Sequence, residues 1–253
     1  MLKDLNKMLF MGIILAFLSW GVQADVVDQI SKSFDVGNSP RLTLQNINGG
    51  VKISAWDKKV IEVNATVTAD TQEEREMVSV IIEQTGRRVE IESKYKKSRG
   101  YKGNSAEVEY KIMVPSFTVL SSIELVNGSL EIKEVQGEIK AELVNGSFKA
   151  TGVGADVNIS SVNGSVSVAY QDDIEELSQI EIETVNGAVK LYLPKIVGAD
   201  VSVETMHGSI KNDFGLLVDK HRFIGRSLDG IIGNGKVNID IETVNGSVKI
   251  LNN

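Results

Sequence analysis

Few residues of this chain could carry chemistry, and they do not form a catalytic pattern. The sequence contains no Cys and two His, His207 and His221, whereas a structural zinc site needs four ligands and a catalytic one three. The candidate carboxylate pairs for glycoside hydrolysis are Asp172 with Asp173 and Asp213 with Asp219. The sequence has no Gly-rich phosphate loop, nucleophile elbow or calcium-binding nonapeptide. We therefore predict no catalytic residue, no cofactor and no metal site.

The most distinctive stretch is a repeated one, Val144-Asn145-Gly146-Ser147. Near-copies begin at Val126, Val162, Val185, Met206 and Val244, and a more distant one at Ile47. Apolar and polar residues alternate on both sides of each copy, which predicts two β-strands hinged on Asn-Gly. We assign the corners to Asn127, Gly128, Asn145, Gly146, Asn163, Gly164, Asn186, Gly187, His207, Gly208, Asn245 and Gly246.

The spacing of the corner glycines sets the size of the repeat. Successive glycines from Gly128 onward lie 18, 18, 23, 21 and 38 residues apart, so the unit is about 18–20 residues and later copies carry insertions. Asn-Gly between alternating runs also fits a meander of hairpins. A parallel β-helix or β-solenoid better explains why one corner is constant, because stacked coils let each Asn amide bond to the next. We predict this all-β fold, preceded by a less regular β-rich segment.

Two expectations follow, one for the corner at Gly146 and one for the corner at His207. Glycine adopts a positive φ at little cost, so we expect Gly146 in a left-handed conformation between buried Val144 and Phe148. His207 occupies the Asn position and is expected to replace an amide in the column rather than to act as a base.

The outward positions form columns of charge. Two residues before the corner Val or Met stand Glu124, Glu142, Ser160, Glu183, Glu204 and Glu242. Five residues after it stand Glu131, Lys149, Ser167, Lys190, Lys211 and Lys249. We expect one acidic face and a neighbouring basic face. A column of single carboxylates lacks the converging oxygens that calcium prefers, so a solvated face is the favoured interpretation.

The first residues resemble an export signal. Lys3 and Lys7 precede an apolar run, Met8 to Trp20, and Val22-Gln23-Ala24 resembles a cleavage site. Cleavage after Ala24 leaves 25 basic and 33 acidic residues from the 27 and 34 of the whole chain. This net charge of −8 argues against nucleic acid as a partner. We expect export, most simply to the periplasm, with the cell surface or secretion as alternatives, and no later membrane span.

Three segments organise the chain. We expect a signal peptide at 1–24, a β-rich segment at 25–115 and solenoid repeats at 116–253, with insertions at 170–178 and 212–234. The longer insertion mixes apolar and charged residues, so it could bind a ligand or cover an open sheet edge. Within the β-rich segment, Thr71 to Met77 suggests a short helix capped by Asp70 or Thr71.

The repeats resemble a known family. The Val-Asn-Gly-Ser copies, the segment from Asn48 to Asp57, the strand from Tyr110 to Pro115 and the closing Ile241 to Ile250 are similar to DUF4097, a bacterial putative-adhesin family. The similarity covers roughly residues 36–251. The resemblance implies an exported β-solenoid, similar to the head domains of autotransporter adhesins, and it assigns no catalytic residues.

The function predicted from these features is non-catalytic. We expect an adhesin-like binding or scaffold protein of the cell envelope, with an envelope protein or a surface glycan as partner. Two alternatives stay open: a carbohydrate-active β-helix enzyme, and an envelope-stress sensor that acts on a signalling protein.

Overall fold

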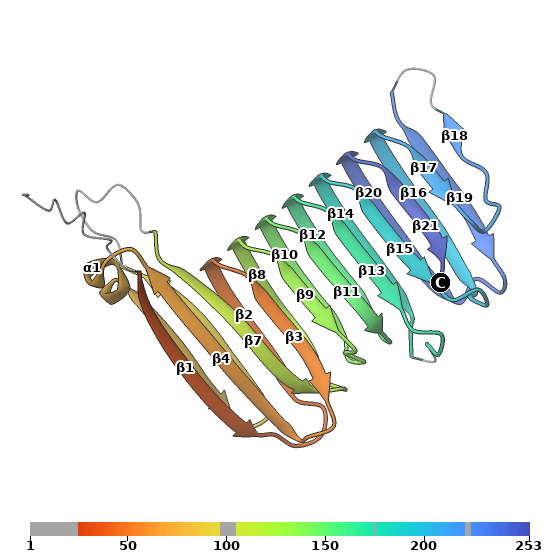
Figure 1. The fold of residues 1–253 in the computed structure, drawn as a ribbon. Helices are drawn as coiled ribbons and strands as arrows, with labels where there is room; N and C mark the ends of the chain where they lie inside the picture. The colour runs from red at the N-terminus through yellow and green to blue at the C-terminus, as the bar shows by residue number, and fades with distance from the viewer. Residues whose placement is uncertain (1–24, 97–104, 175, 221–223) are drawn as a thin grey trace, which may run out of the picture.

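The strands of this protein form two large sheets that face each other across one continuous core (Figure 1). The computed structural model describes residues 25–253 except 97–104, 175 and 221–223. The predicted signal peptide, at 1–24, lies outside the described residues. Within them, no helix has the length and apolar character needed to cross a membrane.

The first sheet has eleven strands. In spatial order they are β18 (Asp219–Lys220), β19 (Arg226–Ile232), β16 (Ala199–His207), β20 (Val237–Asn245), β14 (Gln179–Asn186), β12 (Val157–Asn163), β10 (Ile139–Asn145), β8 (Val119–Asn127), β2 (Arg41–Asn48), β6 (Arg88–Tyr95) and β5 (Val78–Thr85).

The second sheet has ten strands. In spatial order they are β1 (Val26–Asp35), β4 (Val60–Ala69), β7 (Glu107–Pro115), β3 (Val51–Trp56), β9 (Leu130–Lys133), β11 (Phe148–Val153), β13 (Val166–Tyr170), β15 (Val189–Leu193), β21 (Val248–Asn252) and β17 (Ile210–Asn212).

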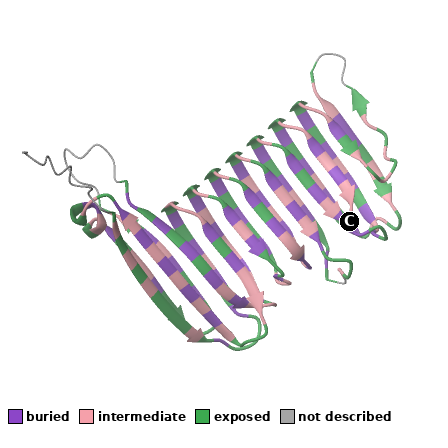
Figure 2. Ribbon diagram, viewed as in Figure 1, coloured by how far each residue is buried: buried purple, intermediate pink, exposed green. Residues whose placement is uncertain are grey.

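Alternation of residue type explains the strands. More buried and more exposed residues alternate along most of them, which gives the striped pattern of Figure 2. In β10, for example, Ile139, Ala141 and Leu143 are buried while Lys140 and Glu142 are exposed. A period of two places every second side chain on the same face of a strand. The apolar set of each strand therefore enters the core between the sheets.

A single short helix, α1 (Gln72–Glu76), interrupts the described strands near the N-terminal end of the stack. Thr71 caps it: its hydroxyl oxygen accepts a hydrogen bond of 3.2 Å from the backbone N–H of Glu74. The short helix expected from Thr71 to Met77 is thereby confirmed, with Thr71 as the cap.

Each repeat contributes one strand to each sheet, joined by the Asn-Gly corner. We call such a pair a rung. Neighbouring rungs pair in parallel and in register, as when Asn145 of β10 lies beside Asn127 of β8 and Asn163 of β12. Antiparallel pairs occur toward both ends, including β1 with β4 and β16 with β19. The all-β prediction is confirmed, but the sheets are mixed rather than parallel throughout.

The rungs do not stack in chain order. The last rung of the chain, β20 with β21, lies between β14 with β15 and β16 with β17 (Figure 1). Similarly, the first rung, β2 with β3, lies between β6 with β7 and β8 with β9. Both terminal repeats are therefore enclosed by paired strands on each side. Strand β19 then covers the free edge of β16.

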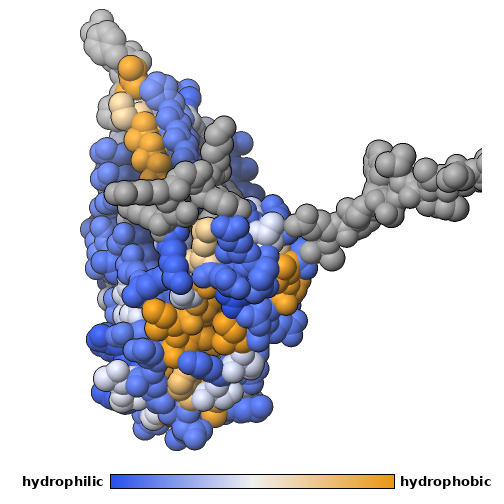
Figure 3. Space-filling view, turned by 90° about the vertical axis from the view of Figure 1, so that its left-hand side faces the viewer, coloured by the Kyte–Doolittle hydropathy of each residue, from blue (hydrophilic) through white to orange (hydrophobic). Residues whose placement is uncertain are grey.

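At the N-terminal end, β1 and β5 are the last strands of the two sheets. Figure 3 views this end and shows apolar surface between polar regions. Ile30, Phe34 and Val80 are partly buried there and pack against the core. The Lys32 ammonium crosses between the sheets and donates a hydrogen bond of 2.9 Å to the carbonyl of Ile82.

The corner glycines are required by crowding between rungs. A Cβ atom on Gly146 would lie 2.0 Å from the carbonyl oxygen of Gly128, and one on Gly164 would lie 2.0 Å from that of Gly146. Gly187, Gly208 and Gly246 meet the same obstacle at 1.8–1.9 Å. The φ of Gly146 is +154°, positive as expected but close to extended. Close approach of backbones is thus the stronger reason for glycine.

The burial expected for Val144 is wrong. Its side chain is 41% exposed, whereas Phe148 is buried as expected. Val144 lies two residues after exposed Glu142 on the same strand, so both point to the outer face of the sheet. The apolar residue that enters the core is Leu143.

The corner asparagines form a continuous ladder. The Asn145 amide donates to the side-chain oxygen of Asn127 at 3.0 Å, and Asn163 donates to Asn145 at 3.0 Å. The same bond of 2.9–3.0 Å joins Asn127 to Asn48, Asn186 to Asn163 and Asn245 to Asn186. The corner backbones bond as well, since Gly146 N–H donates to the carbonyl of Asn163 at 2.9 Å. Each rung is therefore tied to the next at one fixed point.

Replacement of Gly146 tests this crowding. Gly146→Ala should lower the free energy of unfolding by at least about 2 kcal/mol, because the new methyl group collides with backbone rather than with a movable side chain. Ser147→Ala, one residue away on the exposed side, should cost less than about 0.5 kcal/mol. Urea denaturation measures both. Equal and small losses for the two variants would contradict the close approach.

Candidate functional site

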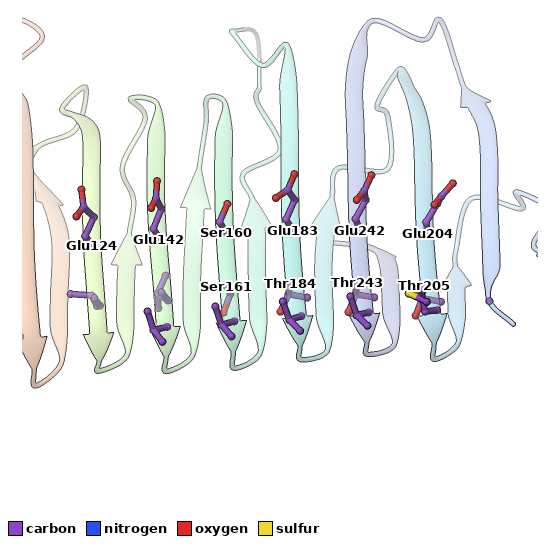
Figure 4. A pocket seen from close by; sticks show the side chains of 18 of the residues that line it. Glu124, Glu142, Ser160, Ser161, Glu183, Thr184, Glu204, Thr205, Glu242 and Thr243 are labelled. Carbon is purple, nitrogen blue, oxygen red and sulfur yellow. The ribbon is translucent and has the colours of Figure 1, made fainter.

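A groove lies on the outer face of the eleven-stranded sheet (Figure 4). It has a volume of about 830 Å³ and crosses β8, β10, β12, β14, β20 and β16. It runs along the stack, across the strands rather than along any one of them. Its lining therefore repeats the same strand positions from rung to rung.

One wall of the groove is aliphatic. It is made by the corner residues of six rungs, in spatial order Val126, Val144, Val162, Val185, Val244 and Met206. Their exposed fractions run from 37% to 53%. Exposed apolar residues gathered in one contiguous patch mark interaction surfaces more often than scattered ones do. We call these six residues the aliphatic wall.

The opposite wall is acidic. Figure 4 shows Glu124, Glu142, Ser160, Glu183, Glu242 and Glu204 aligned along the rungs. Parallel register places Glu142 beside Glu124, and Glu242 between Glu183 and Glu204. We call the five glutamates the acidic wall. On the outer face of the other sheet, Lys149, Ser167, Lys190, Lys249 and Lys211 align in the same way. The predicted acidic and basic faces are confirmed.

The residue between the two walls changes from leucine to serine or threonine along the stack. Between the two walls the groove is closed by the strand backbone, at Leu125, Leu143, Ser161, Thr184, Thr243 and Thr205, whose side chains are buried on the inner face of the sheet. The Thr205 hydroxyl donates a hydrogen bond of 2.9 Å to the carbonyl of Gly246. The hydroxyl oxygens of Ser161, Thr184 and Thr243 have no hydrogen-bond partner among the described protein atoms.

Both ends of the groove are defined. At the C-terminal end it meets Ile224, Gly225 and Arg226, which belong to the longer insertion. Toward the N-terminal end a second hollow of about 500 Å³ continues it and shares Glu124 and Val126. Ile47, 40% exposed, extends the aliphatic wall by one further rung there.

The sequence-predicted chemical residues do not come together. Asp213 accepts a hydrogen bond from the backbone of Asn252 beside the ten-stranded sheet, whereas Asp219 lies in β18 of the other sheet. Asp172 and Asp173 are exposed in the turn after β13. His207 lies beside Asn245 in register, and its carbonyl accepts a bond of 3.1 Å from Gly246. His221 lies outside the described residues.

No group of three His, Asp or Glu side chains in the described part of the chain is arranged to hold a metal ion. The groove, by contrast, is not predicted by the sequence analysis, which expects Val144 to be buried. The signal was available: a residue two positions after an outward Glu must also face outward.

Comparison with known proteins places the chain in a family. A family model described as Toastrack DUF4097 matches residues 116–251. The chain belongs to the DUF4097 family. No curated protein matches it.

This DUF4097 chain also resembles solved structures. It is 19% identical to a "putative cell adhesion protein" from Clostridium sporogenes, with a TM-score of 0.50 over 90% of this chain and 100% of that one. A "putative adhesin" from Bacteroides fragilis is 11% identical, with a TM-score of 0.41 over 89% and 97%. A "putative lipid binding protein" from Parabacteroides distasonis is 12% identical, with a TM-score of 0.35 over 88% and 96%. At such identities the first likeness shows a shared fold.

One carboxylate in the acidic wall of this DUF4097 protein has a shifted pKa. Partial desolvation raises the pKa of Glu242, and the charges of Asp240, Glu183, Glu204 and Glu181 raise it further. On the opposite face, a hydrogen bond from Lys133, at 3.0 Å, lowers the pKa of Glu131. Folding therefore raises the pKa of Glu242 and lowers the pKa of Glu131.

These opposite shifts predict opposite effects of neutralisation. A raised pKa means that folding disfavours the ionised Glu242, and this penalty appears as the pH rises through its folded pKa. Glu242→Gln should raise the melting temperature at pH 7 and leave it nearly unchanged near pH 3. Glu131→Gln, the matched control, should lower the melting temperature at pH 7, with the difference again lost in acid. Changes of the same sign at pH 7 would contradict the opposite pKa shifts.

Proposed function

We propose that this protein is a non-catalytic binding protein of the bacterial cell envelope, and that the groove between the aliphatic and acidic walls is its binding surface. The observation that carries the proposal is the groove itself. Six rungs present exposed aliphatic side chains, five of them beside a carboxylate, and folding alone does not require either column to be so regular. A face that contacted only solvent would have no need of a contiguous column of exposed aliphatic side chains.

The export signal expected from the sequence supports the envelope location. The expected signal peptide at 1–24 would carry the β-rich segment 25–115 and the repeats 116–253 across the membrane, with cleavage after Ala24. The absence of Cys is compatible with an oxidising compartment. The name of the similar Clostridium sporogenes structure, a "putative cell adhesion protein", agrees with a binding role.

We also infer that the repeats form a β-solenoid with coils of about 18–20 residues. Each rung supplies one strand to each sheet, and neighbouring rungs pair in parallel across both sheets. The insertions at 170–178 and 212–234 are then additional residues between successive rungs and are not part of the repeated coil. A stack of this kind is a rigid support for a long surface site, since each coil contacts its neighbours over its whole length.

A small probe tests whether the groove binds apolar cations. Decyltrimethylammonium, below its micellar concentration, should shift the methyl resonances of the aliphatic wall saturably, because its chain contacts valines and its head group faces glutamates. Decyl sulfate should bind more weakly, since the acidic wall repels it. Val162→Lys should abolish the shifts.

The control is Val27→Lys, at an exposed valine of β1 in the other sheet. It should leave the shifts unchanged. Shifts that are absent, unsaturable or equal for the two surfactants would overturn the proposal.

The rival enzymatic function has its own test. Incubation of the processed protein with neutral and acidic polysaccharides should release no new reducing ends. Reproducible release, abolished by Asp213→Asn or Asp219→Asn in the longer insertion, would favour a carbohydrate-active enzyme instead.

A further inference from the structure

The length and repeat distance of the groove restrict what fits in it. Neighbouring strands lie about 4.8 Å apart, so the six rungs of the aliphatic wall span about 24 Å. The occupant must therefore offer an apolar group about every 5 Å along a line of that length. A compact ligand would fill only a part of it.

An α-helix matches this repeat better than an extended chain does. A helix brings one side chain per turn to the same face, at steps of about 5.4 Å, against about 4.8 Å per rung. An extended chain returns to the same face about every 6.7 Å. The mismatch per rung is thus about 0.6 Å for a helix and about 2 Å for a strand. About 16 helical residues cover the six rungs.

The charge of the groove indicates which side chains the helix should carry on the flank beside its apolar stripe. Glu142, Glu183, Glu204 and Glu242 are exposed, and none of them belongs to an ion pair formed within the described residues. A bound cation would offset the repulsion from neighbouring carboxylates, which adds to the desolvation that raises the pKa of Glu242. The occupant should therefore carry Lys or Arg along the flank that faces this wall.

We propose that the groove binds a cationic amphipathic α-helix of another protein, about 16 residues long, with its apolar stripe on the aliphatic wall and its basic flank on the acidic wall. The inference rests on the proposed function and names the partner class. A second copy offers no such segment within the described residues, since α1 spans only Gln72–Glu76 and is largely acidic. An anionic membrane surface meets a repelling row of carboxylates.

A synthetic peptide tests the proposal on the full processed protein. The peptide has about 18 residues, with Leu three and four positions apart, Lys along one flank and a fluorescent label. Fluorescence anisotropy should show saturable binding, and circular dichroism should show that the peptide gains helix on binding. Added salt should weaken the complex. A second peptide with Lys replaced by Glu, and a scrambled one of the same composition, should bind far more weakly.

Protein variants locate the site. Val185→Lys should weaken peptide binding about tenfold or more, which corresponds to losing one buried aliphatic contact. Glu183→Gln should weaken it severalfold and reduce its salt dependence. Val27→Lys and Glu109→Gln, which change exposed residues of the ten-stranded sheet, should leave binding unchanged. Because all four positions are on the surface, melting curves can verify that each variant folds.

The outcomes separate this inference from the proposed function. If decyltrimethylammonium binds in the groove and no helical peptide does, the helical partner is wrong while the binding function stands. If neither binds, both are wrong. Equal binding of the Lys and Glu peptides, or binding unaffected by Val185→Lys, would also overturn the inference. So would self-association, or binding to phosphatidylcholine vesicles, that Val185→Lys abolishes, because a second copy or a lipid surface would then occupy the groove.

Discussion

The structure depends on the close approach of backbones at the Asn-Gly corners. A Cβ atom at Gly146 would lie 2.0 Å from the carbonyl oxygen of the rung before it, and most other corner glycines are as tightly placed. At every corner from Asn48 to Asn245 except that of His207, the asparagine beside the glycine bonds to the next asparagine at 2.9–3.0 Å. Since the corner admits one residue type and one alignment, a slip of any rung by one residue would break both contacts. Register is thereby fixed at a single edge of the stack.

That register creates the surface on which the proposed function rests. Because every rung is aligned at its corner, residues two positions apart along one strand become two long columns across six strands. Separate valines and glutamates would be unremarkable on a protein surface. Aligned, they form the two walls of one groove. The lysine column of the other sheet arises in the same way, so the two faces carry opposite charge.

Local sequence features predicted much of this arrangement. The alternation around each Asn-Gly indicated strands, and the spacing of Glu142 from Asn145 indicated an outward column. The same parity implied an exposed Val144, but the apolar character of valine suggested burial. That conflict marks the candidate site, because an apolar side chain held in solvent is unfavourable unless something covers it.

The order of the rungs could not be predicted from sequence. The repeats are nearly interchangeable in their Val, Asn and Gly positions, so β20 could pair equally well with several partners on local pattern alone. Its place between β14 and β16 follows from the insertion before it, where β19 folds back along β16 and leaves the last repeat to enter on the other side. Such non-local pairing depends on the path of a loop, which a period-two pattern does not encode. The volume of the groove depends on the same order.

Disulfide trapping tests the stacked order most directly, because the chain contains no Cys. Lys190 and Lys249 are register partners in β15 and β21, and neighbouring strands lie within the Cα separation that a disulfide spans. Lys211 lies one rung further, about 10 Å from Lys190 and beyond that range. Mild oxidation should therefore cross-link Lys190→Cys with Lys249→Cys, and peptide mapping should find no such bond between Lys190→Cys and Lys211→Cys. Efficient cross-linking of the second pair and not of the first would contradict the aligned stack.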